Sequence, residues 1–334
     1  MTIGIMYPQM PGALGGVVAY AEVARRGGHR LWFGHSSQTD SHMTMAALIG
    51  RGYSIPFGNA VALFPLWHPH GLAVQARSIA RMSGSSYILA IGPGGHLFQE
   101  KTLGSRIEHP VSATLAYARS LREIIPEASP EGVSPHRDVE LGFGVLRPAM
   151  ARASGRGADW AVTWLTPASY LRSTIVPESR AAARGAGRPT PRVASVVHFA
   201  INRPGRDPVA LSEESNRDHL SAPHYVSMLQ QAGLDIELGD TLGGARALVD
   251  DGTYLYGSAA EVADRIAILE ESGVDHVVIN VFGVVRLHGN AEALVDLEEL
   301  LAELHRREVI HAFEGATARQ HRPIPSPADR LKVQ

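Results

Sequence analysis

The 334-residue chain contains no cysteine, which excludes disulfide bonds, thiolate metal sites and cysteine nucleophiles. It also lacks an excess of charge of either sign. Its 31 basic and 33 acidic residues give a formal net charge of −2, so no broad field favours nucleic acid or an anionic membrane as a partner. No apolar run has the length of a membrane span, and residues 1–30 lack the pattern of a secretion signal, so we expect a cytoplasmic protein.

Short apolar segments of strand length alternate with helical periodicity along most of the chain. Such alternation is typical of parallel βαβ units in which helices cover both faces of the sheet. The repeated unit favours a closed (β/α)8 TIM barrel. The eight predicted strands cover residues 3–7, 30–34, 54–62, 87–92, 139–143, 160–164, 193–201 and 276–281.

Two predicted helices have clear end signals. Residues 259–272 follow a capping box made by Ser258 and Glu261. Residues 69–83 begin with proline and are stopped by Gly84. Both helices present one apolar face, as expected of helices that pack on a barrel.

Two connections are too long for simple turns: residues 94–108 after the fourth strand and residues 202–251 after the seventh. Barrel enzymes build their substrate pockets from loops at the carboxyl ends of the strands. We therefore expect both insertions at the active-site face. The expected organisation is one domain, residues 1–315, followed by a Pro- and Arg-rich C-terminal arm, residues 316–334.

Glycine clusters follow the fourth and fifth predicted strands. Glycine lets backbone N–H groups come close enough to bind a phosphate. One interpretation is that these turns hold a cofactor phosphate, with Arg147 at a helix start as its ionic partner. The other is that the glycines only allow tight turns. The residues concerned are Gly92, Gly94, Gly95, Gly142 and Gly144.

Four segments resemble the bacterial luciferase-like superfamily of flavin- and deazaflavin-dependent enzymes, in the family's order and spacing, over roughly residues 2–304. The segment YAEVARRGGHRLWFGH resembles the family's first helix and second strand. IPFGNAVALFPLWHPHGLAVQARSIARMSGSSYILAIGPGG is similar to its third strand, hinge, helix and fourth strand. GADWAVTW and YGSAAEVADRIAILEESGVDHVVINV resemble the sixth-strand and final-unit signatures.

The resemblance implies roles for particular residues. His35 matches a histidine that deazaflavin-dependent members place near the reactive ring carbon, where imidazole can give or take a proton. Asn59, Ala60 and Val61 match the bulge that supports the cofactor ring, and Ala60–Val61 is the expected cis peptide. The full set of expected cofactor contacts is Asn59, Ala60, Val61, Gly92, Pro93, Gly94, Gly95, Phe98, Gly142, Phe143, Gly144, Val145, Arg147 and Trp164.

One departure from the family pattern bears on this set, and one group of histidines bears on a possible metal site. Ser85 and Ser86 stand where the family usually has Gly-Arg, so an arginine contact is missing. His68, His70 and His96 do not have a recognised metal-ligand spacing, so no metal is expected, and the first two flank a helix start that they are expected to cap.

The resemblance implies hydride transfer between coenzyme F420 and a small-molecule or peptide natural-product substrate, such as an alcohol, an imine or an activated C=C bond. The His35 match and an arginine-rich composition typical of GC-rich genomes favour F420 over FMN. An FMN-dependent monooxygenase and a non-catalytic flavin-binding barrel remain alternatives. A homodimer through the second and third helices is also expected from the family.

Overall fold

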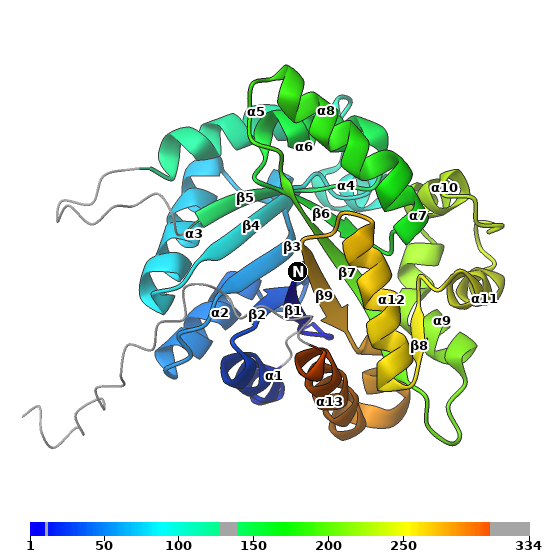
Figure 1. Ribbon diagram of the computed structural model, residues 1–334. Coiled ribbons are helices and arrows are strands. Elements are labelled where there is room, and N and C mark those ends of the chain that lie inside the picture. The colour runs from blue at the N-terminus through cyan, green and yellow to red at the C-terminus, as the bar shows by residue number, and fades with distance from the viewer. Residues whose placement is uncertain (11–12, 127–138, 308–334) are drawn as a thin grey trace, which may run out of the picture.

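The computed structural model describes residues 1–10, 13–126 and 139–307. Within these residues, eight parallel strands close into a barrel, because β9 pairs with both β1 and β7 while β6 also pairs with β7. Figure 1 shows the helices outside this barrel, and the (β/α)8 prediction is confirmed. The barrel strands are β1 (Thr2–Met6), β2 (Arg30–Phe33), β3 (Phe57–Leu63), β4 (Tyr87–Gly92), β5 (Val139–Gly144), β6 (Trp160–Trp164), β7 (Arg192–Ile201) and β9 (His276–Asn280).

The helices follow the strands in the expected alternation. Helix α3 has the predicted bounds, and α12 carries the predicted capping box, in which the Ser258 side chain and the Glu261 carboxylate each accept a backbone N–H. The described helices are α1 (Leu14–Gly27), α2 (Ser41–Gly50), η1 (Phe64–Leu66), α3 (Pro69–Ser83), α4 (His96–Leu103), α5 (Pro110–Ile124), α6 (Pro148–Gly157), α7 (Ala168–Tyr170), η2 (Leu171–Ile175), α8 (Val176–Gly185), α9 (Pro208–Leu220), α10 (Pro223–Gln231), α11 (Thr241–Asp251), α12 (Ala259–Glu271) and α13 (Phe282–Arg306).

The two long connections contain helices of their own. Helix α4 lies in the first, and α9, α10 and α11 make up most of the second. The second is followed by β8 (Leu255–Gly257), a three-residue strand that pairs with the end of β7 beside the barrel. Sequence analysis missed β8 because three residues are too few to show an alternating pattern. The expected C-terminal arm lies outside the described residues.

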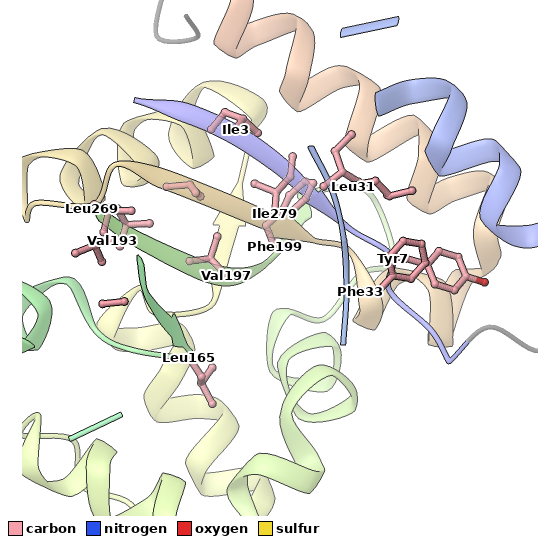
Figure 2. Close-up of a cluster of buried hydrophobic side chains, with 14 of the residues drawn as sticks. Ile3, Tyr7, Leu31, Phe33, Leu165, Val193, Val197, Phe199, Leu269 and Ile279 are labelled. Carbon is pink, nitrogen blue, oxygen red and sulfur yellow. The ribbon is translucent and has the colours of Figure 1, made fainter. Parts of the chain in front are cut away.

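The core forms two shells. Alternate side chains of each strand point outward and pack under the helices; Figure 2 shows Ile3, Val197 and Ile279 in this outer shell. The other side chains fill the barrel interior, which contains Met6, Trp32, Ala60, Ile88, Ala90, Trp160, Val162, Ala194, Val196 and Val278. The interior is therefore packed protein, and a ligand has room only at an end of the barrel.

Large side chains close the amino-terminal end of the interior. The Trp32 Nε1 donates to His276 Nε2 at 2.9 Å, and the His276 ring also meets Trp160 edge-on. Gly4 provides the space for this contact, since an added Cβ would lie only 2.5 Å from His276 Nε2 and 2.6 Å from Trp32 Nε1. The Arg192 guanidinium lies 4.0 Å from the Trp160 ring centroid.

Candidate active site at the barrel mouth

Alternate side chains of each strand point into the barrel, and this alternation brings three of them to the carboxyl-terminal mouth. On β6 and β7 the inward residues continue past Val162 and Val196 to Trp164 and His198, and on β9 the last residue is Asn280. His198 and Asn280 lie side by side in register, and the Asn280 Nδ2 is 3.1 Å from His198 Nε2. The mouth therefore has a polar floor above an apolar interior.

A cavity of about 370 Å³ opens at this mouth beside β2 and β3. His35, two residues after β2, lies on its wall, half-buried and edge-on to Phe98 of α4 with the ring centroids 5.7 Å apart. Burial lowers the pKa of His35, and the Asp40 carboxylate partly offsets this by raising it. The imidazole is thus mainly neutral at pH 7 and able to accept a proton.

The β3 bulge forms another part of this wall. The pairing register with β4 shifts between Asn59 and Ala62, and the Ala60–Val61 peptide is cis, as predicted. Val61 lines the cavity. The Asn59 side chain does not line it: its Nδ2 donates to Ser41 Oγ at 3.0 Å and its Oδ1 accepts from the buried Tyr87. Any contact of Asn59 with a ring would therefore come from its backbone.

The predicted glycines have a second role in this structure. A Cβ on Gly92 or Gly144 would lie 2.8 or 3.1 Å from a methyl group of Val61, so both glycines make room for the bulge. Gly94 has a left-handed φ of 76°, and an added Cβ there would lie 2.6 Å from the Phe98 ring. These glycines therefore shape the mouth around Val61 and Phe98, which neither interpretation of the sequence anticipated.

A buried glutamine holds the turn after β4, and sequence analysis missed it. The Gln99 side chain donates to the carbonyls of Pro93 and Gly94 at 3.1 and 2.9 Å and accepts from the Ile107 N–H at 2.8 Å. Among the described residues, the N–H groups of Gly94 and Gly95 have no hydrogen-bond acceptor. They remain available as donors at the start of α4.

Three basic side chains gather near this turn. His224 of α10 faces Gly95, whose added Cβ would lie 2.8 Å from the imidazole Cε1. The pKa of His224 is lowered by burial and then by the positive charges of Arg147 and His96. Arg147 is exposed at the N-cap of α6, where the sequence placed it. This rim, defined by His96, Arg147 and His224, is suited to an anion.

The mouth beside β6 and β7 is filled by protein. The His219 ring of α9 stacks on Trp164 with the ring centroids 5.5 Å apart and also contacts Tyr225. Burial and the nearby His219 lower the pKa of His198 to about 3, although the Asn216 side chain acts in the opposite direction. The sequence assigned no role to these histidines, and only the inward phase of β7 could have indicated His198.

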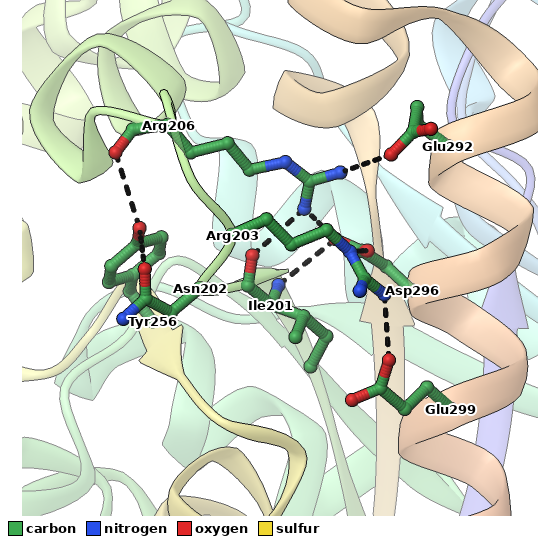
Figure 3. A network of polar contacts seen from close by, with 8 residues as sticks. All are labelled: Ile201, Asn202, Arg203, Arg206, Tyr256, Glu292, Asp296 and Glu299. Atoms are coloured by element: carbon green, nitrogen blue, oxygen red, sulfur yellow. Dashed lines mark hydrogen bonds and ion pairs between the residues drawn. The ribbon is translucent and has the colours of Figure 1, made fainter.

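A network of ion pairs anchors the insertion that carries His219 and His224 (Figure 3). The fully buried Asp296 carboxylate of α13 accepts from the Ile201 N–H at 3.0 Å and from Arg203 Nε at 2.9 Å, and it also pairs with Arg206. Tyr256 of β8 donates to Asn202 at 2.8 Å. The chain leaving β7 is thereby fixed to α13 before α9 begins.

The remaining predicted residues lie on β5, directly after it, and at the start of α3. Phe143 and Val145 point into the outer core, so they can offer a ligand only their backbone. His68 caps α3 as predicted, with its Nδ1 accepting from the His70 N–H at 3.3 Å. Within the described ranges, no three His, Asp or Glu side chains gather as a metal site, and no helix could cross a membrane.

The histidine, the bulged strand and the glycine turns lie at the carboxyl ends of the strands of a closed parallel barrel, the end at which barrel enzymes have their active sites. The sequence profile of the family described as luciferase-like monooxygenase matches residues 2–276. The chain belongs to this luciferase-like family. Curated protein sequences gave no match.

Solved structures with this fold include both deazaflavin- and flavin-dependent proteins. An F420-dependent secondary alcohol dehydrogenase, solved with an F420–acetone adduct, is 16% identical, with 90% of this chain and 98% of that chain covered and a TM-score of 0.63. The F420-dependent tetrahydromethanopterin reductase of Methanopyrus kandleri is 17% identical, with 91% and 99% covered and a TM-score of 0.65. The 3,6-diketocamphane monooxygenase component from Pseudomonas putida, in complex with FMN, is 17% identical, with 91% and 99% covered and a TM-score of 0.60.

Proposed function

We propose that the protein is an oxidoreductase that transfers a hydride between coenzyme F420 and a small-molecule or peptide natural-product substrate. The observation that carries this proposal is the position of His35, half-buried on a cavity whose wall also includes Val61 of the β3 bulge. Membership of the luciferase-like family and the F420-dependent structural neighbours support it.

The residues at the mouth fit a ring with a phosphate-bearing tail. The cavity of about 370 Å³ is flanked by apolar side chains, including Trp67 and Phe98, that would contact a planar ring. Arg147 and the N–H groups of Gly94 and Gly95 would hold the phosphate. When bound, the deazaflavin supplies the two-electron hydride chemistry for which the protein has no group of its own.

His35 would handle the proton that accompanies the hydride. In the direction of alcohol oxidation, the neutral imidazole accepts the proton of the substrate hydroxyl. A hydride leaves the carbon that bears this hydroxyl for the oxidised cofactor, and the product is a carbonyl compound. In the reverse direction the imidazolium returns that proton to the new alkoxide oxygen. Phe98 packs edge-on against the His35 imidazole and limits the orientations that this ring can take.

Titration of the purified protein with F420 and with FMN tests the cofactor, followed by turnover with secondary alcohols and with reduced cofactor plus imines or activated alkenes. We expect F420 to bind more tightly and hydride transfer to occur without oxygen. Oxygen consumption with reduced FMN would favour the monooxygenase alternative. Tight binding without any turnover would favour the non-catalytic barrel.

FMN is the second candidate because of the basic rim. FMN ends in a phosphate monoester that carries up to two negative charges, and the Arg147 guanidinium can pair with it while the N–H groups of the His96 and His224 rings donate hydrogen bonds. Under this candidate the same cavity would hold the flavin ring, and His35 would lie beside it. The relative affinities for the two cofactors separate the candidates.

We also propose a homodimer. Helices α2 and α3 expose three large apolar side chains, Met43, Val74 and Met82, with 64%, 39% and 56% of their surface accessible. Light scattering should give twice the chain mass of 35.8 kDa. Substitution of all three by glutamate should convert the dimer to a monomer, and an unchanged mass would contradict this interface.

A further inference from the structure

A buried polar cluster lies directly behind the cavity, between α2 and strands β3 and β4. It consists of His42, Asn59 and Tyr87, whose exposed fractions are 4%, 1% and 0%. Asp40 completes it at the cavity wall, where Asp40 and His42 both line the same space as His35. No role for Asp40, His42 or Tyr87 follows from the sequence.

The hydrogen bonds fix the direction of every donor in this cluster. The Asn59 Nδ2 faces the Phe33 carbonyl at 3.5 Å and Ser41 Oγ at 3.0 Å, so the Oδ1 must be the atom that meets Tyr87. An amide oxygen only accepts, and the single proton of Tyr87 is therefore used on Asn59. His42 Nε2 lies 2.9 Å from the Tyr87 oxygen and must donate to it.

This assignment leaves the other His42 nitrogen without a proton. A neutral imidazole with Nε2 protonated has a bare lone pair on Nδ1. Within the described residues, His42 Nδ1 indeed has no hydrogen-bond partner, and the nearest charge is Asp40 Oδ1 at 3.8 Å. A proton added at the buried Nδ1 would face this carboxylate.

Asp40 also connects the two imidazoles of the cavity. Its carboxylate acts on both His35 and His42, in each case raising a pKa that burial lowers. The groups packed around His42 from other elements are Tyr87 of β4 and the Trp67 ring before α3, and neither is charged at neutral pH. Asp40 is therefore the counter-charge available to either imidazole once it is protonated.

We propose that Asp40 and His42 form a second acid–base pair on the cavity wall. Tyr87 and Asn59 hold this pair in position by hydrogen bonds, and the pair takes up the proton exchanged at His35. The proton leaves the His35 imidazolium and binds His42 Nδ1, so His35 becomes neutral and His42 becomes the cation beside Asp40. Tyr87 and Asn59 are positioning residues. The use of this pair in turnover rests on the proposed function, whereas its existence does not.

Histidine-selective ¹⁵N NMR of the ligand-free protein tests the pair directly. We expect neutral His42 as the Nε2–H tautomer, and in Tyr87→Phe, which removes its acceptor, a mixture of both tautomers. In Asp40→Asn the pKa values of His35 and His42 should both fall. Asparagine is as good an N-cap as aspartate, so α2, whose Met43 N–H donates to Asp40, should remain intact.

Asp240→Asn is the matched control, because Asp240 caps α11 through the Gly243 N–H, in the insertion after β7, and does not line the cavity. It should leave both histidine titrations unchanged. A wild-type His42 in the Nδ1–H tautomer would overturn the proposal, as would unchanged pKa values of His35 and His42 in Asp40→Asn.

The role in turnover is read from His42→Gln, whose side-chain amide keeps a donor toward Tyr87 but cannot be protonated. We expect kcat to fall with KM and cofactor affinity within a few-fold of wild type, and the pH profile to lose one ionisation. A wild-type pH profile in this variant would overturn the proton role. The NMR measurements need neither cofactor nor substrate. They can therefore confirm the Asp40–His42 pair even if the proposed redox activity is not found.

Discussion

The two ends of the barrel interior both contain histidine, but they use it differently. At the amino-terminal end, His276 has both ring nitrogens occupied, with Thr2 Oγ1 2.6 Å from Nδ1 and Trp32 Nε1 2.9 Å from Nε2. At the mouth, His42, His198 and His219 each keep an Nδ1 atom without a hydrogen-bond partner in the described part of the chain. A saturated imidazole serves packing, whereas one with a free nitrogen can take part in chemistry or binding.

The same contrast extends to the neighbouring side chains. Trp32 at the closed end is fully buried, and glycines 4 and 58 make room for it. Trp164 at the mouth is only half-buried and stacks on a histidine from an inserted helix. We therefore expect substitutions at the closed end to change stability and substitutions at the mouth to change binding and turnover.

The largest effect is expected for His35→Ala. Loss of a positioned acid–base group typically lowers a rate by about 10²- to 10⁴-fold. Cofactor affinity should stay within a few-fold, because the proposed ring and phosphate contacts come from other elements, and urea denaturation should change little. His35→Gln should restore the packing against Phe98 but not the rate. Near-normal turnover in both variants, with an unchanged pH profile, would make His35 a structural residue.

The second effect concerns the closed end. Trp32→Ala should lower the free energy of unfolding by about 3–5 kcal/mol, because the cavity created cannot collapse against the neighbouring strands. Trp164→Ala should cost less, since its side chain is partly exposed, but it should weaken cofactor or substrate binding. Equal destabilisation of the two variants in urea would remove the distinction between the ends.

Acid should destabilise the protein through His198. Its pKa is lowered to about 3 by burial, against 6.5 when exposed, so the unfolded chain binds a proton between these values and the native state does not. The contribution of neutral His198 to the free energy of unfolding is therefore complete above pH 6.5. It is lost as the pH falls toward 3, by about 1.4 kcal/mol per pH unit. His198→Asn should flatten the dependence of the unfolding free energy on pH in this window. An unchanged slope would show that His198 is protonated in the folded protein.

The barrel was predictable because it depends on period and length. Strands β4 and β6 have the predicted bounds, and the others differ by a few residues at their ends. The cis peptide and the bulge followed from the resemblance of the third-strand segment. The capping residues Ser258 and His68 were also visible, since capping is set by residues adjacent in the chain.

The contacts at the mouth could not be predicted in the same way. His224 reaches Gly95, and His219 reaches Trp164, from an insertion whose start is held by Asp296, 90–95 residues later in the chain. Nor could spacing indicate that Asn59 is turned toward Tyr87, since the bulge shifts the register of β3 there. Such contacts depend on tertiary packing of side chains that carry no local pattern.

The smallest effect tests whether the mouth is shaped by glycine space. Gly94→Val should weaken binding of F420 and FMN by about 1–3 kcal/mol, because Gly94 has a positive φ and its Cβ would press on Phe98, which flanks the cavity. Gly104→Val is the matched control: it has a φ of 73° at the end of α4, with no atom within 4 Å of an added Cβ. It should cost similar stability while leaving affinity unchanged. If isothermal titration showed the same loss of affinity in both variants, backbone strain would explain the effect of Gly94→Val. The turn after β4 would then have no special part in cofactor binding.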